Sequence, residues 1–314
     1  MCNGSIMDKL VTFAFPLMLT SILQLMFNAV DIIVVGRFSG SQALAAVGST
    51  SALINIFTNL FIGISLGANV LAARYYAAGK DREMSEAVHT AITLALISGI
   101  VMAFVGVAAS RLALSLMGTP DDVIDQSVLY MKIYFMGMPF FMLYNYGASI
   151  LRAVGDTRRP LYFLIAAGLT NVVLDLLLVI VIPLDVAGVA IGTVASQMIS
   201  CILVLRCLYK SESSYQLRFP RLTIKWKYLK QIFQVGIPAG LQSTVINFSN
   251  AMLQSSVNSF GSVAMAGYTA ANNIFGFLYA AANSVTQACM SFTSQNYGVG
   301  KLKRMDKVLI NCMI

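Results

Sequence analysis

Long apolar segments alternate with short polar clusters along the whole chain. The apolar segments show no period-two alternation and lie at about 10–35, 50–73, 87–110, 128–151, 160–183, 187–208, 229–257 and 265–295. A further apolar run begins near 305. A membrane-spanning helix needs about 20 apolar residues, whereas a barrel strand would alternate between apolar and polar positions. The pattern therefore predicts an all-α polytopic membrane protein with eight spans and the start of a ninth.

Composition supports this interpretation. Of the 314 residues, 58% are hydrophobic and 11% are charged, whereas soluble domains contain roughly 25% charged residues. A single soluble core of this length could not bury so much apolar surface. We therefore expect the bilayer to surround most of the chain.

The net charge of +8 is distributed unevenly between alternate loops. One set of loops carries most of the cations, namely Lys9, Arg74–Arg82, Arg152, Arg158, Arg159, Arg206–Lys230 and Lys301–Lys307. The other set carries only Arg37 and Arg111, together with Asp121, Asp122, Asp125 and Asp185. By the positive-inside rule, the first set faces the cytoplasm. We expect a cytoplasmic (inner) membrane protein with a cytoplasmic N-terminus and no nucleic-acid partner.

The cysteines, the histidine and the other reactive residues form no pattern typical of an enzyme or of a cofactor site. The five cysteines and the single histidine fit no metal-ligand spacing and are Cys2, Cys201, Cys207, Cys289, Cys312 and His89. No nucleophile–base pattern lies near a membrane face. We expect a protein that is not an enzyme, has no cofactor and functions as a monomer.

The chain contains an internal repeat. The segment FPLMLTSIL from Phe15 resembles IPAGLQSTV from Ile237, and the two prolines, Pro16 and Pro238, are 222 positions apart. After a one-residue gap, YYAAGK at 75–80 matches NYGVGK at 296–301. The repeat unit spans six helices, an even number, so the two copies run in the same direction across the membrane. Two such repeats are a transporter design.

The repeat predicts the domain organisation. Residues 1–208 form an N-lobe of six transmembrane helices, and residues 209–228 form a cytoplasmic linker. Residues 229–314 form a partial C-lobe of two helices and the start of a third. A complete second copy would extend to about residue 430, so we expect a C-terminally truncated chain.

Two carboxylates lie inside predicted spans, at Asp31 and Asp175. Each costs roughly 2.5–3.5 kcal/mol at the bilayer centre on insertion scales. Asn171 lies four residues before Asp175 on the same helix face. At 1.5 Å per residue, Asp31, Asp175 and Thr193 lie about 9–12 Å below the outer ends of three helices. Such oxygens suit a hard cation such as Na⁺, and a desolvated carboxyl group can also hold a proton. The alternative is simple hydrogen bonding between helices.

Other residues are weaker candidates. Polar or aromatic side chains that could line a pore or substrate cavity are Gln24, Asn28, Tyr144, Asn145, Gln242 and Asn247. Polar helix packing explains these residues equally well. Pro16 and Pro139 lie within spans and could act as hinges or kinks, because proline interrupts helical hydrogen bonding.

The motifs VDIIVVGRFSGSQALAAVG, ILRAVGDTRRPLYFLIAAGLTNVVLDLLLVI and GIPAGLQS together resemble prokaryotic MATE (multidrug and toxic compound extrusion) transporters of the MOP superfamily. The resemblance implies twelve helices in two lobes and multidrug efflux of cationic and lipophilic compounds by antiport with Na⁺ or H⁺. It also implies a cation-coupling site at Asp31, Asn171, Asp175 and Thr193, and a first-helix bend at Pro16. Some members carry an acid on the first helix of the second lobe, and this chain has none there.

Two alternatives remain open at the level of sequence. The chain could be a lipid-linked flippase of the same superfamily, which a basic central cavity would favour. It could also be a truncated, non-transporting membrane remnant. The sequence does not distinguish Na⁺ from H⁺, because the same oxygens serve both, and it does not identify the substrate.

Overall fold

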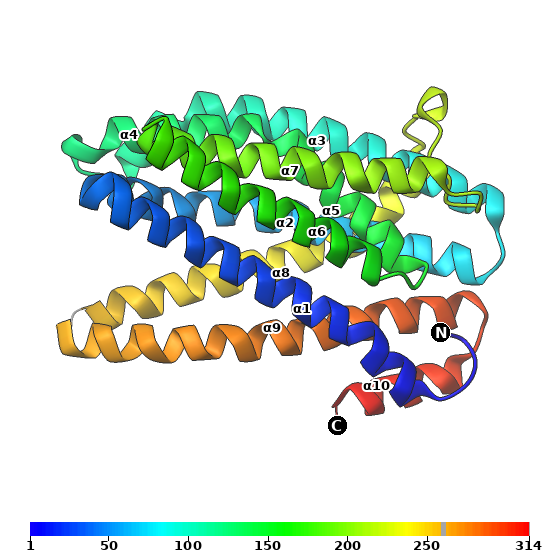
Figure 1. The fold of residues 1–314 in the computed structure, drawn as a ribbon. Helices are drawn as coiled ribbons and strands as arrows, with labels where there is room; N and C mark the ends of the chain where they lie inside the picture. The colour runs from blue at the N-terminus through cyan, green and yellow to red at the C-terminus, as the bar shows by residue number, and fades with distance from the viewer. Residues whose placement is uncertain (259–261, 314) are drawn as a thin grey trace.

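The computed structural model describes residues 1–258 and 262–313, and every regular element in this part of the chain is helical (Figure 1). The α-helices are α1 (Ile6–Val34), α2 (Gly40–Ala77), α3 (Asp81–Leu116), α4 (Asp121–Met136), α5 (Met138–Ala153), α6 (Arg158–Leu176), α7 (Asp185–Lys210), α8 (Trp226–Asn258), α9 (Ser262–Gly298) and α10 (Leu302–Met313). Three short elements join them: the π-helices η1 (Val35–Ser39) and η2 (Leu177–Val181), and the 3₁₀-helix η3 (Phe219–Arg221). The prediction of an all-α fold is confirmed.

Among the described residues, four helical segments are long and apolar enough to cross a membrane: Ile6–Ala77, Asp81–Leu116, Arg158–Val181 and Asp185–Lys210. The first of these contains 72 residues, far more than the roughly 20 that one crossing needs. The chain reverses within it at Gly40, whose φ of 86° lies in the left-handed region that favours glycine. α1 and α2 are therefore two separate crossings, as predicted.

The predicted span at 128–151 needs a correction, because it is not one continuous helix. α4 and α5 meet there at an angle of 47°. Pro139 stands in the first turn of α5 and has no N–H with which to continue the hydrogen bonding of α4. Gly137 lies at the break, where a Cβ atom would approach Val194 of α7 to 2.6 Å. The chain therefore bends where α7 presses against it.

α2 is the central helix, and it packs against α3, α4, α5, α8 and α9. Its closest contact is with α8. A Cβ atom on Gly63 would lie 2.2 Å from the Cα of Gly240, and one on Gly236 would lie 2.5 Å from the Cα of Ile64. Gly63 and Gly67 on α2, like Gly236 and Gly240 on α8, are four residues apart. Small residues at this spacing allow two membrane helices to approach closely.

The helix pairings follow the internal repeat. α8 crosses onto α2, and α1 packs in the same way onto α9, where Phe13 and Phe292 make an edge-to-face contact at 5.7 Å. The first helix of each predicted copy thus packs on the second helix of the other copy. The boundaries at 1–208, 209–228 and 229–314 stay a prediction, because these contacts join the two parts closely.

The connection between α7 and α8 is fixed to the start of α3. The Arg218 backbone N–H donates to His89 Nε2 at 3.1 Å, and the Tyr228 hydroxyl donates to Glu86 at 2.8 Å. Lys225 forms an ion pair with the same glutamate. These contacts hold the connection against the end of the bundle where α2 ends and α3 begins.

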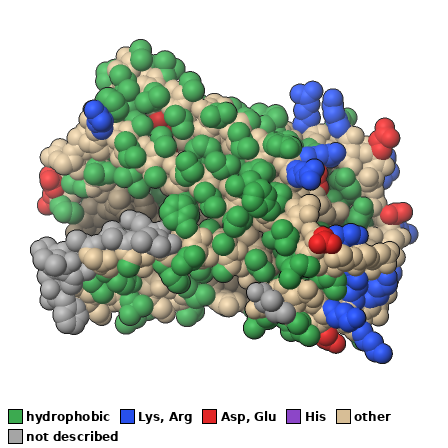
Figure 2. All heavy atoms as spheres, turned by 60° about the horizontal axis from the view of Figure 1, so that its bottom comes forward, with side chains coloured by type: hydrophobic (Ala, Val, Ile, Leu, Met, Phe, Trp, Pro, Cys, Tyr) green, Lys and Arg blue, Asp and Glu red, His purple; other side chains and the backbone are tan. Residues whose placement is uncertain are grey.

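Charged side chains gather at that end of the molecule. Figure 2 shows Lys and Arg side chains there, apolar side chains over the middle, and a hollow at the opposite end. Close approaches between α2 and α8–α9 also lie toward the cationic end, where a Cβ on Gly298 would meet the Arg74 carbonyl at 2.3 Å. Beyond them α8 is exposed, as at Val245, Phe248 and Met252. The helices are thus packed together at the cationic end and separate toward the other end.

Candidate functional site

The two membrane carboxylates lie together between α1 and α6. The side chains of Asp31 and Asp175 are in direct contact. Asp175 is completely buried and Asp31 is half-buried. The Asn171 amide lies 3.5 Å from Asp175 Oδ1, where it can donate a weak hydrogen bond. The structure therefore brings together three of the four residues that the sequence singles out.

The third wall of the site comes from α7. A Cβ atom on Gly192 would lie only 2.2 Å from Asp175 Oδ1, so glycine leaves the space that the carboxyl group occupies. Thr193 follows directly and is half-buried, and its hydroxyl donates to the Val189 carbonyl of its own helix at 2.9 Å. The Thr193 hydroxyl thus uses its hydrogen within α7 and keeps oxygen lone pairs that can accept, and its place in the cation site stays a prediction.

The backbone changes character next to both carboxylates. η1 begins four residues after Asp31, and η2 begins two residues after Asp175. These two π-helical turns contact each other. π-Helical turns inside α-helices occur frequently at functional sites, since they alter the direction of neighbouring side chains. Here they follow α1 and α6 directly and lie beside each other, close in sequence to the two acids.

The carboxyl pair lacks compensating charge. Neither aspartate forms an ion pair with any described residue. Asp31 Oδ1 and Asp175 Oδ2 are buried without a hydrogen-bond partner. Two ionised carboxylates in contact repel each other strongly in a poorly solvated site. The pair therefore requires either a shared proton or a bound cation.

The predicted donor set around the carboxyl pair consists of oxygen atoms. No group of three or more His, Cys, Asp or Glu side chains converges in the described part of the chain. The predicted ligands are two carboxylates, the Asn171 amide and the Thr193 hydroxyl, and their oxygens are of the ligand type that hard cations take.

Two phenols beside the acids were missed by the sequence reasoning. Tyr130 and Tyr134 on α4 stack with ring centroids 6.2 Å apart. Tyr130 interacts electrostatically with both aspartates, and Tyr134 interacts with Asp31. Their spacing of four residues puts both rings on one face of α4. This spacing is visible in the sequence, but only the packing of α4 in the bundle shows that this face of α4 lies beside the acids.

The residues expected to line a substrate cavity divide into two groups. Gln24, Asn28 and Gln242 are exposed, and Asn247 is half-buried. Tyr144 is buried instead, and its hydroxyl donates to the Pro160 carbonyl at 3.3 Å. Asn145 is half-buried and donates to the Phe141 carbonyl of its own helix at 2.8 Å. Tyr144 and Asn145 thus engage the bundle itself.

The two prolines also differ in position. Pro16 is buried within α1, where the Thr20 hydroxyl donates to its carbonyl at 2.8 Å. Pro139 stands at the bend between α4 and α5. Both are located where a helix can change direction, and their role as hinges stays a prediction.

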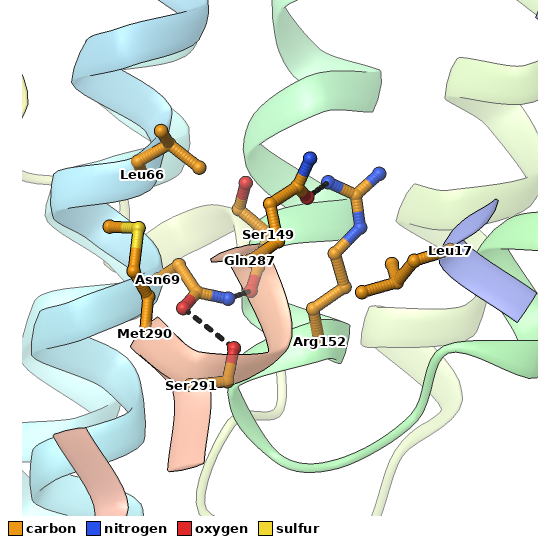
Figure 3. Close-up of a pocket in the computed structure, with 8 residues that line it drawn as sticks. All are labelled: Leu17, Leu66, Asn69, Ser149, Arg152, Gln287, Met290 and Ser291. Atoms are coloured by element: carbon orange, nitrogen blue, oxygen red, sulfur yellow. Dashed lines mark hydrogen bonds between the residues drawn. The ribbon is translucent and has the colours of Figure 1, made fainter. Parts of the chain in front are cut away.

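A second polar cluster joins α2 and α5 to α9, and Figure 3 shows its side chains. The Asn69 amide donates to the Ser149 carbonyl at 2.8 Å and accepts from the Ser291 hydroxyl at 3.1 Å. Arg152 donates through Nη1 to Gln287 at 3.1 Å, while its Nε is buried without a partner. The enclosed space is only about 10 Å³, enough for a water molecule. The cluster therefore acts as a polar contact between helices.

Comparisons with known proteins agree on one family. Residues 16–177 and 238–314 match the MatE family. The chain is 30% identical over 316 residues to the probable multidrug resistance protein YoeA of Bacillus subtilis, covering 97% of this chain and 67% of that protein. It is likewise 30% identical to the probable multidrug resistance protein YpnP of the same organism, covering 96% and 68%.

Solved structures give the same result for the fold. The outward-facing structure of a multidrug resistance MATE family transporter of the MOP superfamily superposes with a TM-score of 0.92 at 22% sequence identity. The match covers 99% of this chain and 69% of that one. The chain thus spans about two thirds of the length of the proteins that it matches. It is a multi-pass membrane protein, and it belongs to the MatE family.

Proposed function

We propose that the protein is a secondary active multidrug efflux antiporter that exports cationic or lipophilic compounds in exchange for Na⁺ or H⁺. Membership of the MatE family and the multidrug resistance relatives support the general activity. The coupling mechanism is our inference from the carboxyl pair. Asp31 and Asp175 bind the coupling cation, while Asn171 and Thr193 supply further oxygens.

One observation supports this mechanism most strongly: two contacting carboxyl groups each keep a buried oxygen without a partner. If these side chains only joined helices, asparagine or serine would do so at a lower free-energy cost of membrane insertion than aspartate. A pair that must take up a cation, and can release it, meets the requirement of coupling. Coupling further requires that the cation bind the outward- and inward-open states with different affinities.

The geometry also indicates the direction of the cycle. The helices separate away from the cationic end, and the carboxyl pair lies near the far ends of α1 and α6. If the Lys and Arg residues face the cytoplasm of the inner membrane, this form is open to the outside. Cations then enter from outside, and the exposed faces at Gln24, Asn28 and Gln242 lie along the substrate path.

The proposal is tested by efflux from vesicles that contain the protein, with Na⁺ and proton gradients imposed separately. We expect Asp31→Asn and Asp175→Asn each to abolish gradient-dependent efflux. Asp125→Asn is the matched control, because Asp125 is an exposed aspartate in a surface ion pair with Arg111. Undiminished efflux and unchanged cation dependence in the Asp31→Asn variant would refute the mechanism.

A further inference from the structure

A side groove separates the first halves of α1 and α6. Its volume is about 430 Å³, within the range of roughly 300–1,000 Å³ found for ligand pockets. The lining residues are Val11, Thr12, Phe15, Pro16, Leu19, Arg158, Leu161 and Tyr162. Most of this lining is apolar, and a single charged residue, Arg158, stands at one end.

The groove is separate from the carboxyl pair. Pro16 precedes Asp31 by 15 positions on the same helix, which corresponds to about 22 Å along the helix axis. The groove lies toward the end of the molecule where Lys and Arg side chains gather. Phe15 and Tyr162 are 54% and 61% exposed, so the apolar wall faces outward from the helices.

The charge of Arg158 is not used by the fold. Within the described part of the chain it makes no hydrogen bond and no ion pair. Its neighbour Arg159 differs, since it forms an ion pair with Asp156 at 3.2 Å and contacts Cys207 at 3.5 Å. The adjacent arginines therefore have the same charge and nearly the same position, but only Arg158 is available to a ligand.

We propose that this groove binds one anionic phospholipid, with the lipid phosphate on Arg158 and an acyl chain along Phe15, Leu19 and Leu161. Guanidinium groups pair with phosphate through two parallel N–H donors. An apolar channel that begins at a cation in the headgroup region matches the two chemical parts of such a lipid. A soluble anion would leave the apolar wall unused. A zwitterionic lipid has the same phosphate, but its headgroup cation offsets the charge that attracts Arg158.

The site also suggests a role for the lipid. Pro16 is part of the groove wall, and proline weakens the helix at that point. A lipid seated between α1 and α6 supports α1 beside this weak point. The bound lipid is thus placed to influence the position of α1 without touching the carboxyl pair.

The test uses the purified full chain in lipid nanodiscs and introduced tryptophan fluorescence. The chain has one tryptophan, Trp226, which is 73% exposed and is replaced by Phe. Tyr162→Trp then places the only indole at the groove. We expect brominated phosphatidylglycerol to quench this tryptophan at a lipid fraction about fivefold lower than brominated phosphatidylcholine requires. A fivefold difference corresponds to the roughly 1 kcal/mol that one basic residue contributes at an anionic membrane surface.

Arg158→Gln should remove this preference, and Arg159→Gln should retain it. Equal quenching by the two lipids in the parent protein would overturn the proposal, and so would equal effects of the two arginine variants.

A second pair of variants tests the apolar part of the groove. Val11→Trp should fill the groove and lower lipid retention in native mass spectrometry, whereas Val173→Trp, at a 64% exposed position on α6, should not. Unchanged retention with Val11→Trp would contradict a lipid seated in the groove.

Discussion

α1 and α8 occupy equivalent places in the internal repeat, yet only one of them carries a candidate cation site. Both contain a proline, 222 positions apart, and each packs on the second helix of the other copy. At the same offset, Asp31 corresponds to Leu253, which is 55% exposed. The packing is thus shared by α1 and α8, whereas only α1 carries an acid at this position.

This difference separates what a helix needs to pack from what it needs to bind a cation. α8 approaches α2 through glycines, and such a contact requires only small residues at the right spacing. A cation site requires oxygens from several helices at one level of the membrane. For α1 and the turn η1 that follows it, the partner helices are α6 and α7, whereas α8 itself contains no acidic residue.

The largest effect is expected from moving the acid between the two copies. Asp31→Leu combined with Leu253→Asp should abolish cation binding, measured by titration of the purified protein with Na⁺ and by proton release. We expect no recovery from Leu253→Asp, because the partner acid Asp175 lies on α6, which packs on α1 and interacts with Asp31. Recovery of binding in the double variant would show that the copies are chemically equivalent.

A smaller effect is expected from Gly192→Ala. The added Cβ would fall 2.2 Å from Asp175 Oδ1 and push the carboxyl group away from Asp31. Overpacking of this kind costs about 1–3 kcal/mol, which corresponds to a roughly 5- to 150-fold loss of cation affinity if the whole cost falls on binding. Gly48→Ala on α2 is the control, since no atom lies within 4 Å of its added Cβ. Equal affinities of the two variants would show that Gly192 does not shape the site.

The packing shared by α1 and α8 can be tested at the α2–α8 contact. In Gly240→Ala, the added Cβ would lie 2.5 Å from the Leu60 carbonyl oxygen, a backbone atom that cannot rotate away. We expect about 1–3 kcal/mol of destabilisation in denaturant unfolding, with cation affinity unchanged. Gly276→Ala, where the added Cβ meets no atom within 4 Å, should leave stability near that of the parent.

An effect of similar size is expected at the arginine contact between α5 and α9. Gln287 aligns with Leu66, 221 positions earlier, and both line the same small cavity. Gln287→Leu leaves Arg152 without its partner, so we expect a loss of about 1–3 kcal/mol in unfolding free energy. Arg152→Met should cost less, and adding it to Gln287→Leu should recover part of the loss. Additive losses would show that the two side chains do not interact.

Sequence reasoning correctly located the helices and the acids for simple physical reasons. A bilayer requires long apolar helices, so apolar length alone identifies the spans. A carboxylate in such a helix is costly, so Asp31 and Asp175 are conspicuous without any structure. The repeat was visible because the same packing problem is solved twice with similar residues.

Only the tertiary structure decided how these parts meet. The close fit of Gly137, at the bend between α4 and α5, against Val194 of α7 joins residues that are distant in sequence. The contact of Asp31 with Asp175, the space left by Gly192 and the two phenols of α4 depend on how α1, α4, α6 and α7 rotate against one another. Helical periodicity says which side chains share a face of one helix, but packing between helices decides which faces meet, and therefore which polar groups form a site.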